Sequence, residues 1–108
     1  MNETVKQFGK RLRELRRAAK LTLEKAAEKA ELSAKFIGEI ERGEKRPSFD
    51  GILALAKGLN VPARLLFRFD GEEADTQVLR QRIDTILTGC TPAQLQQAYR
   101  ILKAVVEP

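Results

Sequence analysis

The chain has 108 residues and a formal net charge of +5, which fits one domain or a small domain with an appendage. It has no histidine and a single cysteine, Cys90, which excludes an internal disulfide, zinc sites of the usual Cys/His kind and His-based catalytic triads. No apolar run approaches the ~20 residues that span a bilayer, and the first residues lack the apolar centre of a signal peptide. We therefore expect a reducing, cytoplasmic location and no cofactor.

The charge is distributed unevenly along the chain. Residues 1–69 hold 16 Lys and Arg against 9 Asp and Glu, whereas residues 70–108 hold 4 against 6. A basic first part is typical of a domain that faces a polyanion, and the acidic tail indicates a different task.

An amphipathic helix is predicted over residues 3–20. Its apolar side chains recur at alternating spacings of three and four residues, and they are Val5, Phe8, Leu12, Leu15 and Ala19. A basic stripe follows another face and consists of Lys6, Lys10, Arg13, Arg17 and Lys20. This stripe either meets a polyanion or is simply solvated.

Two short helices follow, separated by about three residues. Thr22 is the predicted N-cap of the first, which ends near Glu31, and Ser33 is the predicted N-cap of the second, which ends where Gly43 suits the C′ position. In the later of these two helices, the apolar side chains of Ile37 and Ile40 share one face. The other face is small and polar, with Ala34, Lys35, Gly38, Glu39 and Arg42.

A fourth helix is predicted to begin after the loop "GEKRPS", with Ser48 as its N-cap. Its expected inner face consists of Phe49, Ile52, Leu53, Ala56 and Leu59. Pro62 suits the first turn of a short fifth helix that ends near Phe67.

The acidic stretch at residues 70–75 is the expected linker, and two further helices are predicted beyond it. Gly89 closes the first, and the run Thr91-Pro92-Ala93-Gln94 has the signature of a capped helix start. The two apolar stripes consist of Leu79, Ile83, Ile86 and Leu87, then Leu95, Ala98, Leu102 and Val105. No strand pattern is present, so we expect an all-α chain.

Residues 76–108 are too few to fold alone, and their apolar stripes therefore need a partner. A second copy of the same hairpin, related by twofold symmetry, is the simplest partner. The alternative is that the hairpin packs back on the first domain.

The third predicted helix follows the second as in a helix-turn-helix, in which the later helix enters the DNA major groove. Residues 5–69, and "IERGEKRPS" above all, resemble the Cro/CI-type (xenobiotic-response-element) helix-turn-helix family. The resemblance implies a five-helix, lambda-repressor-like DNA-binding domain over residues 1–69, followed by the linker and a dimerisation hairpin over residues 76–108. The hairpin loosely resembles the helical hook of a sporulation and biofilm repressor.

The resemblance also implies roles for individual residues. Arg16 and Glu41 match an ion pair between the first and third helices, and the Arg also reaches a phosphate. The candidate base-reading residues are Ala34, Lys35, Gly38 and Glu39. The candidate phosphate-contacting residues are Arg16, Thr22, Phe36, Arg42, Lys45, Arg46 and Ser48.

Several of these residues have a plainer interpretation. Lys35, Lys45 and Arg46 could be ordinary solvated charges, Arg42 could only stabilise a helix C-terminus, and Phe36 could be filler or touch a thymine methyl. The chain also departs from the family, because Leu23 replaces a Gln that often contacts DNA. Glu31 replaces the usual glycine of the turn, so a non-glycine residue is expected to adopt a positive φ.

A sequence-specific regulator of transcription, most simply a repressor, is the function these observations favour. It would bind a palindromic site in double-stranded DNA as a homodimer, in the nucleoid. The alternative is an antitoxin or a transcriptional adaptor whose tail binds a toxin, an antirepressor or another protein. Nothing in the residues supports an enzyme.

Overall fold

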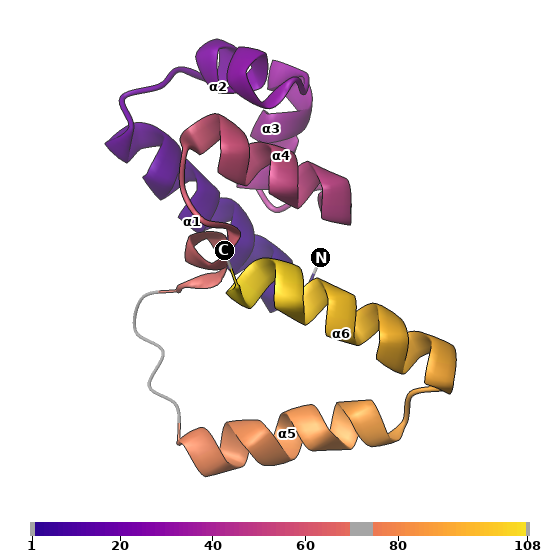
Figure 1. Ribbon diagram of the computed structural model, residues 1–108. Helices are drawn as coiled ribbons and strands as arrows, with labels where there is room; N and C mark the ends of the chain where they lie inside the picture. Colours follow the sequence, from indigo (N-terminus) through magenta and orange to yellow (C-terminus); the bar gives the residue numbers. More distant parts are fainter. Residues whose placement is uncertain (1, 70–74, 108) are drawn as a thin grey trace. The chain divides into compact units, whose positions relative to one another are not determined.

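The computed structural model describes residues 2–69 and 75–107, and this part of the chain is all-α, as predicted (Figure 1). Its elements are α1 (Glu3–Ala18), α2 (Leu23–Ala30), α3 (Ala34–Glu41), α4 (Phe49–Leu59), the 3-10 helix η1 (Ala63–Phe67), α5 (Thr76–Thr88) and α6 (Pro92–Val106). The chain divides into two compact units, Met1–Phe69 and Asp70–Pro108. Apart from Asp75, the predicted linker lies outside the described residues. None of the helices in the described part is long and apolar enough to cross a membrane.

Side-chain caps set where the helices begin. The side-chain oxygens of Thr22, Ser33 and Ser48 each accept a hydrogen bond from the backbone N–H three residues later, at 3.0–3.1 Å. At the start of α6, Thr91 and Gln94 form a reciprocal capping box, with N–H to side-chain oxygen distances of 3.0 and 3.2 Å. All four predicted N-caps are confirmed, because capping depends only on residues within one turn.

Residues in the left-handed backbone conformation set where the first four helices end. Lys20, Glu31, Gly43 and Asn60 have φ values of 61°, 56°, 75° and 56°. After each of them, the next N–H donates to a carbonyl five residues earlier, as Leu32 does to Ala27 at 3.0 Å. The positive φ expected at Glu31 is confirmed, whereas α1 ends at Ala18, before the predicted limit.

Replacing Glu31 by glycine is expected to stabilise the protein by about 1 kcal/mol, because a side chain strains the left-handed conformation and glycine does not. Urea denaturation of Glu31→Gly and the parent would measure this difference. The matched control is Glu28→Gly, an exposed position inside α2, which should lose about 1 kcal/mol. A loss of stability in both variants would mean that the turn is not strained.

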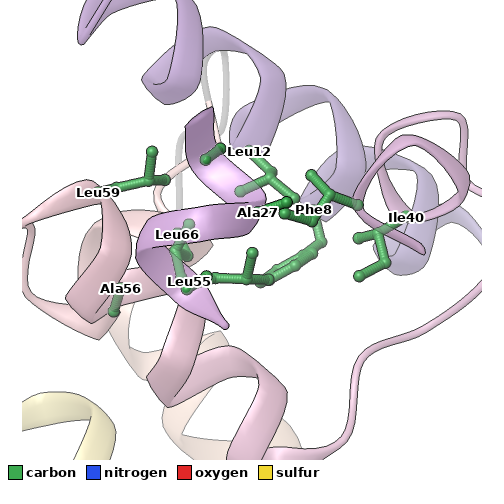
Figure 2. Close-up of a cluster of buried hydrophobic side chains, with 11 residues drawn as sticks. Phe8, Leu12, Ala27, Ile40, Leu55, Ala56, Leu59 and Leu66 are labelled. Atoms are coloured by element: carbon green, nitrogen blue, oxygen red, sulfur yellow. The ribbon is translucent and has the colours of Figure 1, made fainter. Parts of the chain in front are cut away.

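One apolar core lies within residues 1–69, and side chains from α1 to α4 and η1 fill it (Figure 2). The side chains less than 2% exposed are Leu12, Ile37, Ile40, Leu55 and Leu66. The prediction that Leu53 faces inward is wrong, because Leu53 is 38% exposed, whereas Leu55 is 1% exposed. Leu53 lies about 100° around the helix from Ile52, outside the stripe that faces the core.

Two glycines let helix backbones come close together. A Cβ built on Gly9 in α1 would overlap the carbonyl oxygen of Ile40, and one built on Gly58 in α4 would lie 2.9 Å from the backbone nitrogen of Ala30. Arg11 adds a tie across the unit, since its Nε donates to the carbonyl oxygen of Leu65 at 2.9 Å. These contacts fix α3 against α1, and α2 against α4.

Candidate nucleic-acid interface

The outer face of α3 follows directly from how the helix is anchored. Ile37 and Ile40 are completely buried, with 0% exposure, and they hold one side of α3 in the core. The opposite side carries Lys35, which is exposed, and Glu39, which is half-exposed, while Ala34 lies at the edge of this face, half-buried and packed in part against the core. This face is slim enough to lie in a groove, and it offers one cation and one carboxylate as hydrogen-bonding groups.

Gly38 lies beside these residues but is buried. A Cβ at this position would lie 3.0 Å from Nη1 of Arg42 and 3.7 Å from Cδ1 of Leu23. The two side chains therefore cover the backbone at Gly38, and a base would find little surface there. The structure thus gives Gly38 a packing role, in contrast to the base-reading role expected from the sequence.

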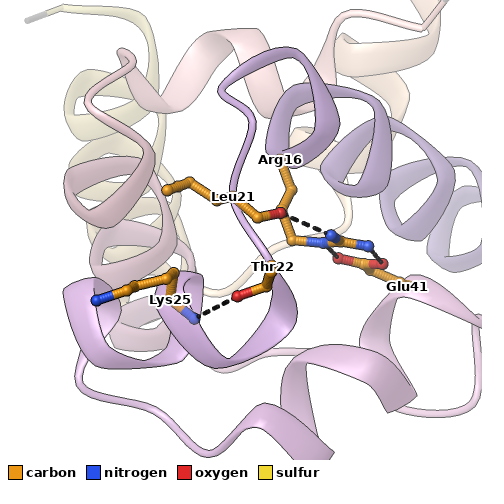
Figure 3. Close-up of polar contacts among 5 residues, drawn as sticks. All are labelled: Arg16, Leu21, Thr22, Lys25 and Glu41. Atoms are coloured by element: carbon orange, nitrogen blue, oxygen red, sulfur yellow. Dashed lines mark hydrogen bonds and ion pairs between the residues drawn. The ribbon is translucent and has the colours of Figure 1, made fainter.

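An ion pair joins α1 to the end of α3 (Figure 3). Nε and Nη2 of Arg16 donate to the two carboxylate oxygens of Glu41 at 2.6 and 2.9 Å, and Nη1 donates to the carbonyl oxygen of Leu21 at 2.9 Å. The Arg16 and Glu41 side chains are only 11% and 6% exposed. The hydrogen bond to Glu41 raises the pKa of Arg16, and partial burial opposes that rise.

Three of the five N–H groups of Arg16 donate to acceptors within the protein, so its main role is to hold elements of the fold together. It connects α1, the loop before α2 and the C-terminal end of α3. The contact with phosphate expected for Arg16 would have to use the remaining hydrogens of Nη1 and Nη2, and it stays a prediction.

Donor groups gather at the starts of α2 and α4. The Thr22 and Ser48 hydroxyl oxygens accept from the backbone, so each hydroxyl hydrogen can still be donated to a phosphate. The first two N–H groups of each helix have no intrahelical acceptor, and the helix dipole favours an anion there. Lys45 and Arg46 are exposed in the loop just before α4.

The contacts of Phe36 agree less well with the predicted phosphate contact than with a space-filling role. Its backbone N–H is donated to Ser33 Oγ at 3.0 Å, and its half-buried ring packs against the core. The plainer interpretation, in which the ring fills space beside the core, agrees better with these contacts.

Arg42 is exposed at the end of α3, and its Nε donates to Glu44 at 2.7 Å. The side chains of this pair are 59% and 51% exposed, so the attraction is weak in water. Binding of a phosphate could therefore replace Glu44 at small cost. The hydrogen bond to Glu44 also raises the pKa of Arg42.

A surface hollow of about 240 Å³ lies between α1, α2 and α3. The residues that line it are Arg13, Arg16, Leu23, Gly38, Glu41 and Arg42. Leu23 supplies an apolar wall to this hollow. Arg13 was assigned only to the basic stripe of α1 in the sequence; its spacing of three residues from Arg16 was the signal that could have placed it at this site.

Residues 7–69 match the family model of the helix-turn-helix domain. The chain therefore belongs to the helix-turn-helix domain family, and the resemblance to Cro/CI-type regulators is confirmed. The solved structure of the restriction-modification controller protein C.AhdI from Aeromonas hydrophila is 41% identical, with a TM-score of 0.57 over 58% of this chain and 96% of that chain. The SinR–SinI protein complex, 23% identical with a TM-score of 0.56 over 89% of this chain and 94% of that chain, is similar in fold alone.

Among curated relatives, an HTH-type transcriptional regulator of Mycobacterium tuberculosis (strain H37Rv) is 32% identical over 84 residues. The match covers 74% of this chain, which spans only 60% of the length of that relative. The HTH-type transcriptional regulator YobD of Bacillus subtilis is 28% identical over 101 residues, covering 94% of this chain and 88% of YobD.

Proposed function

We propose that this protein is a sequence-specific DNA-binding regulator of transcription that acts as a homodimer. The observation that carries the proposal is the outer face of α3, which is slim and polar and follows and precedes in the chain the donor-rich starts of α2 and α4. The names of the relatives support the same class, since the curated ones are HTH-type transcriptional regulators and the solved one is a controller protein. The proposal places the protein on chromosomal DNA in the cytoplasm and assigns it no catalytic step.

In this mechanism, phosphate contacts hold the protein on the duplex and α3 reads the bases. Thr22, Ser48, Lys45 and Arg46 grip the backbone on the two sides of α3, which fixes the depth and register of the helix. Ala34, Lys35 and Glu39 then meet base edges in the major groove. Repression follows from occupancy of the site, and the residue 76–108 hairpin holds two copies in the spacing that a palindrome requires.

The electrostatic part of the mechanism predicts a steep dependence on salt. The logarithm of the affinity should fall linearly with the logarithm of salt concentration, by about 0.9 for each phosphate contacted. Arg46→Gln should flatten this slope by about one per protomer, whereas Lys57→Gln, an exposed change in the last turn of α4, should leave it unchanged. Equal slopes for Arg46→Gln and the parent would remove Arg46 from the interface, and no affinity for any duplex would reject the function.

Glu39 gives the proposal a sharper prediction. A carboxylate can accept a hydrogen bond from cytosine N4, and it repels a backbone or base edge that presents only acceptors. Glu39→Gln should therefore lose about tenfold discrimination at one position of the binding site, which corresponds to about 1.4 kcal/mol, and should bind random DNA more tightly. Sequencing of duplexes selected by each protein would measure both effects, with Glu28→Gln on the exposed side of α2 as the control. An unchanged motif and affinity would leave Glu39 as a solvated helix charge.

A further inference from the structure

The second compact unit, called the tail here, has apolar helix faces but no core among its described residues. Among residues 75–107, no residue is buried, and α5 and α6 diverge from the turn at Gly89–Cys90 (Figure 1). The large apolar side chains that are 40–68% exposed in this unit are Val78, Leu79, Ile83, Ile86, Leu95, Tyr99, Ile101, Leu102 and Val106. Soluble monomers rarely expose a contiguous apolar patch of more than a few hundred Å², so these faces need a partner.

The two helices are apolar to different extents around their axes. At 3.6 residues per turn, the apolar side chains of α6 cover an arc of about 160° around the helix axis, with Ile101 at one edge and Tyr99 at the other. The main apolar stripe of α5 covers about 100°, with Ile86 and Leu87 at its edges. A stripe of about 100° suits a helix packed on one side of a core. The wider arc of α6 needs neighbours on two sides, so α6 suits the inside of a bundle and α5 the outside.

The arc of α6 is also suited to face a copy of itself. Ala98 lies close to the midpoint of α6 and to the centre of the arc, with Leu95 three residues before it and Leu102 four residues after it. In an antiparallel pair that crosses at Ala98, Leu95 of one copy meets Leu102 of the other. The small alanine lets the two backbones approach within the usual 8–10 Å between helix axes.

Charge gives no obstacle to such a pair. The described residues of the tail carry four basic and three acidic side chains, namely Arg80, Arg82, Arg100, Lys103, Asp75, Asp84 and Glu107. A nearly neutral surface does not repel its own copy, whereas a partner of strongly acidic or basic chemistry would find little to attract it. A surface hollow near the end of α6 is lined by Tyr99, Leu102, Lys103, Val106 and Glu107, and the Lys103 ammonium lies 5.7 Å from the centre of the Tyr99 ring.

We infer that α6 lies at the twofold axis of the homodimer, packed antiparallel on α6 of a second copy, with the two α5 helices outside. This arrangement rests on the proposed homodimer and specifies the surface through which its two copies meet. It buries Leu95, Ala98 and Leu102 of both copies at the centre, where each copy contributes the same patch, as twofold symmetry requires.

Cysteine cross-linking of the full chain tests this arrangement, with Cys90→Ser as the background. Ala98→Cys should form a disulfide-linked dimer on mild oxidation, because residues at the axis bring their Cα atoms within the ~7 Å that a disulfide spans. Arg100→Cys, on the opposite side of α6, and Leu79→Cys, on α5, should stay unlinked. Leu95→Cys mixed with Leu102→Cys should cross-link, and either variant alone should not.

The outcomes separate this inference from the proposals beneath it. Sedimentation under reducing conditions reports the dimer, and a gel shift on the same proteins reports DNA binding. A dimer that cross-links through Leu79→Cys but not Ala98→Cys, or through Leu95→Cys alone, overturns the α6 arrangement and leaves the homodimer standing. A parent chain that sediments as a monomer at all concentrations overturns both, while DNA binding is judged by the gel shift alone.

Discussion

Glu41→Gln is expected to lower the free energy of unfolding by about 3 kcal/mol. The substitution keeps the shape of the side chain but leaves the Arg16 guanidinium, 11% exposed, without its counter-charge. Removing one partner of a buried pair costs about 3–5 kcal/mol, because the remaining charge cannot recover its hydration. Urea denaturation followed by circular dichroism would measure the loss as a lower midpoint with an unchanged slope.

Two controls show whether the loss comes from an unpaired charge. The double change Arg16→Met with Glu41→Leu removes both charges and fills the space, so it should be more stable than either single change. Glu28→Gln breaks the Lys25–Glu28 pair, whose side chains are 65% and 73% exposed, and should cost less than 1 kcal/mol. A double variant that loses the sum of the two single changes would contradict the account.

Gly9→Ala is expected to destabilise the protein by a similar amount, about 3 kcal/mol, for a steric reason. The added Cβ would overlap the carbonyl oxygen of Ile40 and lie 2.9 Å from that of Glu41. These are backbone atoms, so α1 and α3 must separate, which opens the core and disturbs the ion pair at the end of α3. Thermal unfolding of the variant and the parent would measure the effect.

Gly38→Ala is the matched control, since both glycines are buried and helical. The nearest atom to a Cβ at Gly38 is Nη1 of Arg42, at the end of a flexible side chain that can move. The helix preference for alanine over glycine is about 1 kcal/mol, so Gly38→Ala should be as stable as the parent or more stable. If Gly9→Ala proved equally harmless, the close approach of α1 and α3 would not be needed for the fold.

Local features of the fold could be predicted because they depend on neighbouring residues. Thr22, Ser33 and Ser48 begin helices by capping groups within one turn, and Gly43 ends α3 in the left-handed conformation that glycine favours. The choice between Leu53 and Leu55 could not be made in this way. Both are leucines in an apolar run, and only the packing of α4 on α2 and η1 decides which one is buried.

The candidate site also depends on packing that local sequence patterns do not reveal. The pairing of Arg16 with Glu41 came from a family resemblance, since nothing local joins residues 25 positions apart. The burial of Gly38 depends on where the Leu23 and Arg42 side chains lie, and the place of Arg13 depends on how α1 meets α3. Periodicity assigns a residue to a face of its helix, but the packing of three helices decides what covers that face.

Selection of bound duplexes from a random pool, followed by sequencing, tests the central proposal most directly. We expect a palindromic motif with two half-sites whose centres lie about one helical turn, 10–10.5 base pairs, apart. Lys35→Ala should change the bases selected, whereas Lys57→Ala should not. A recovered pool no more alike than the starting pool, bound no better than random DNA at the same salt, would contradict sequence-specific binding by α3.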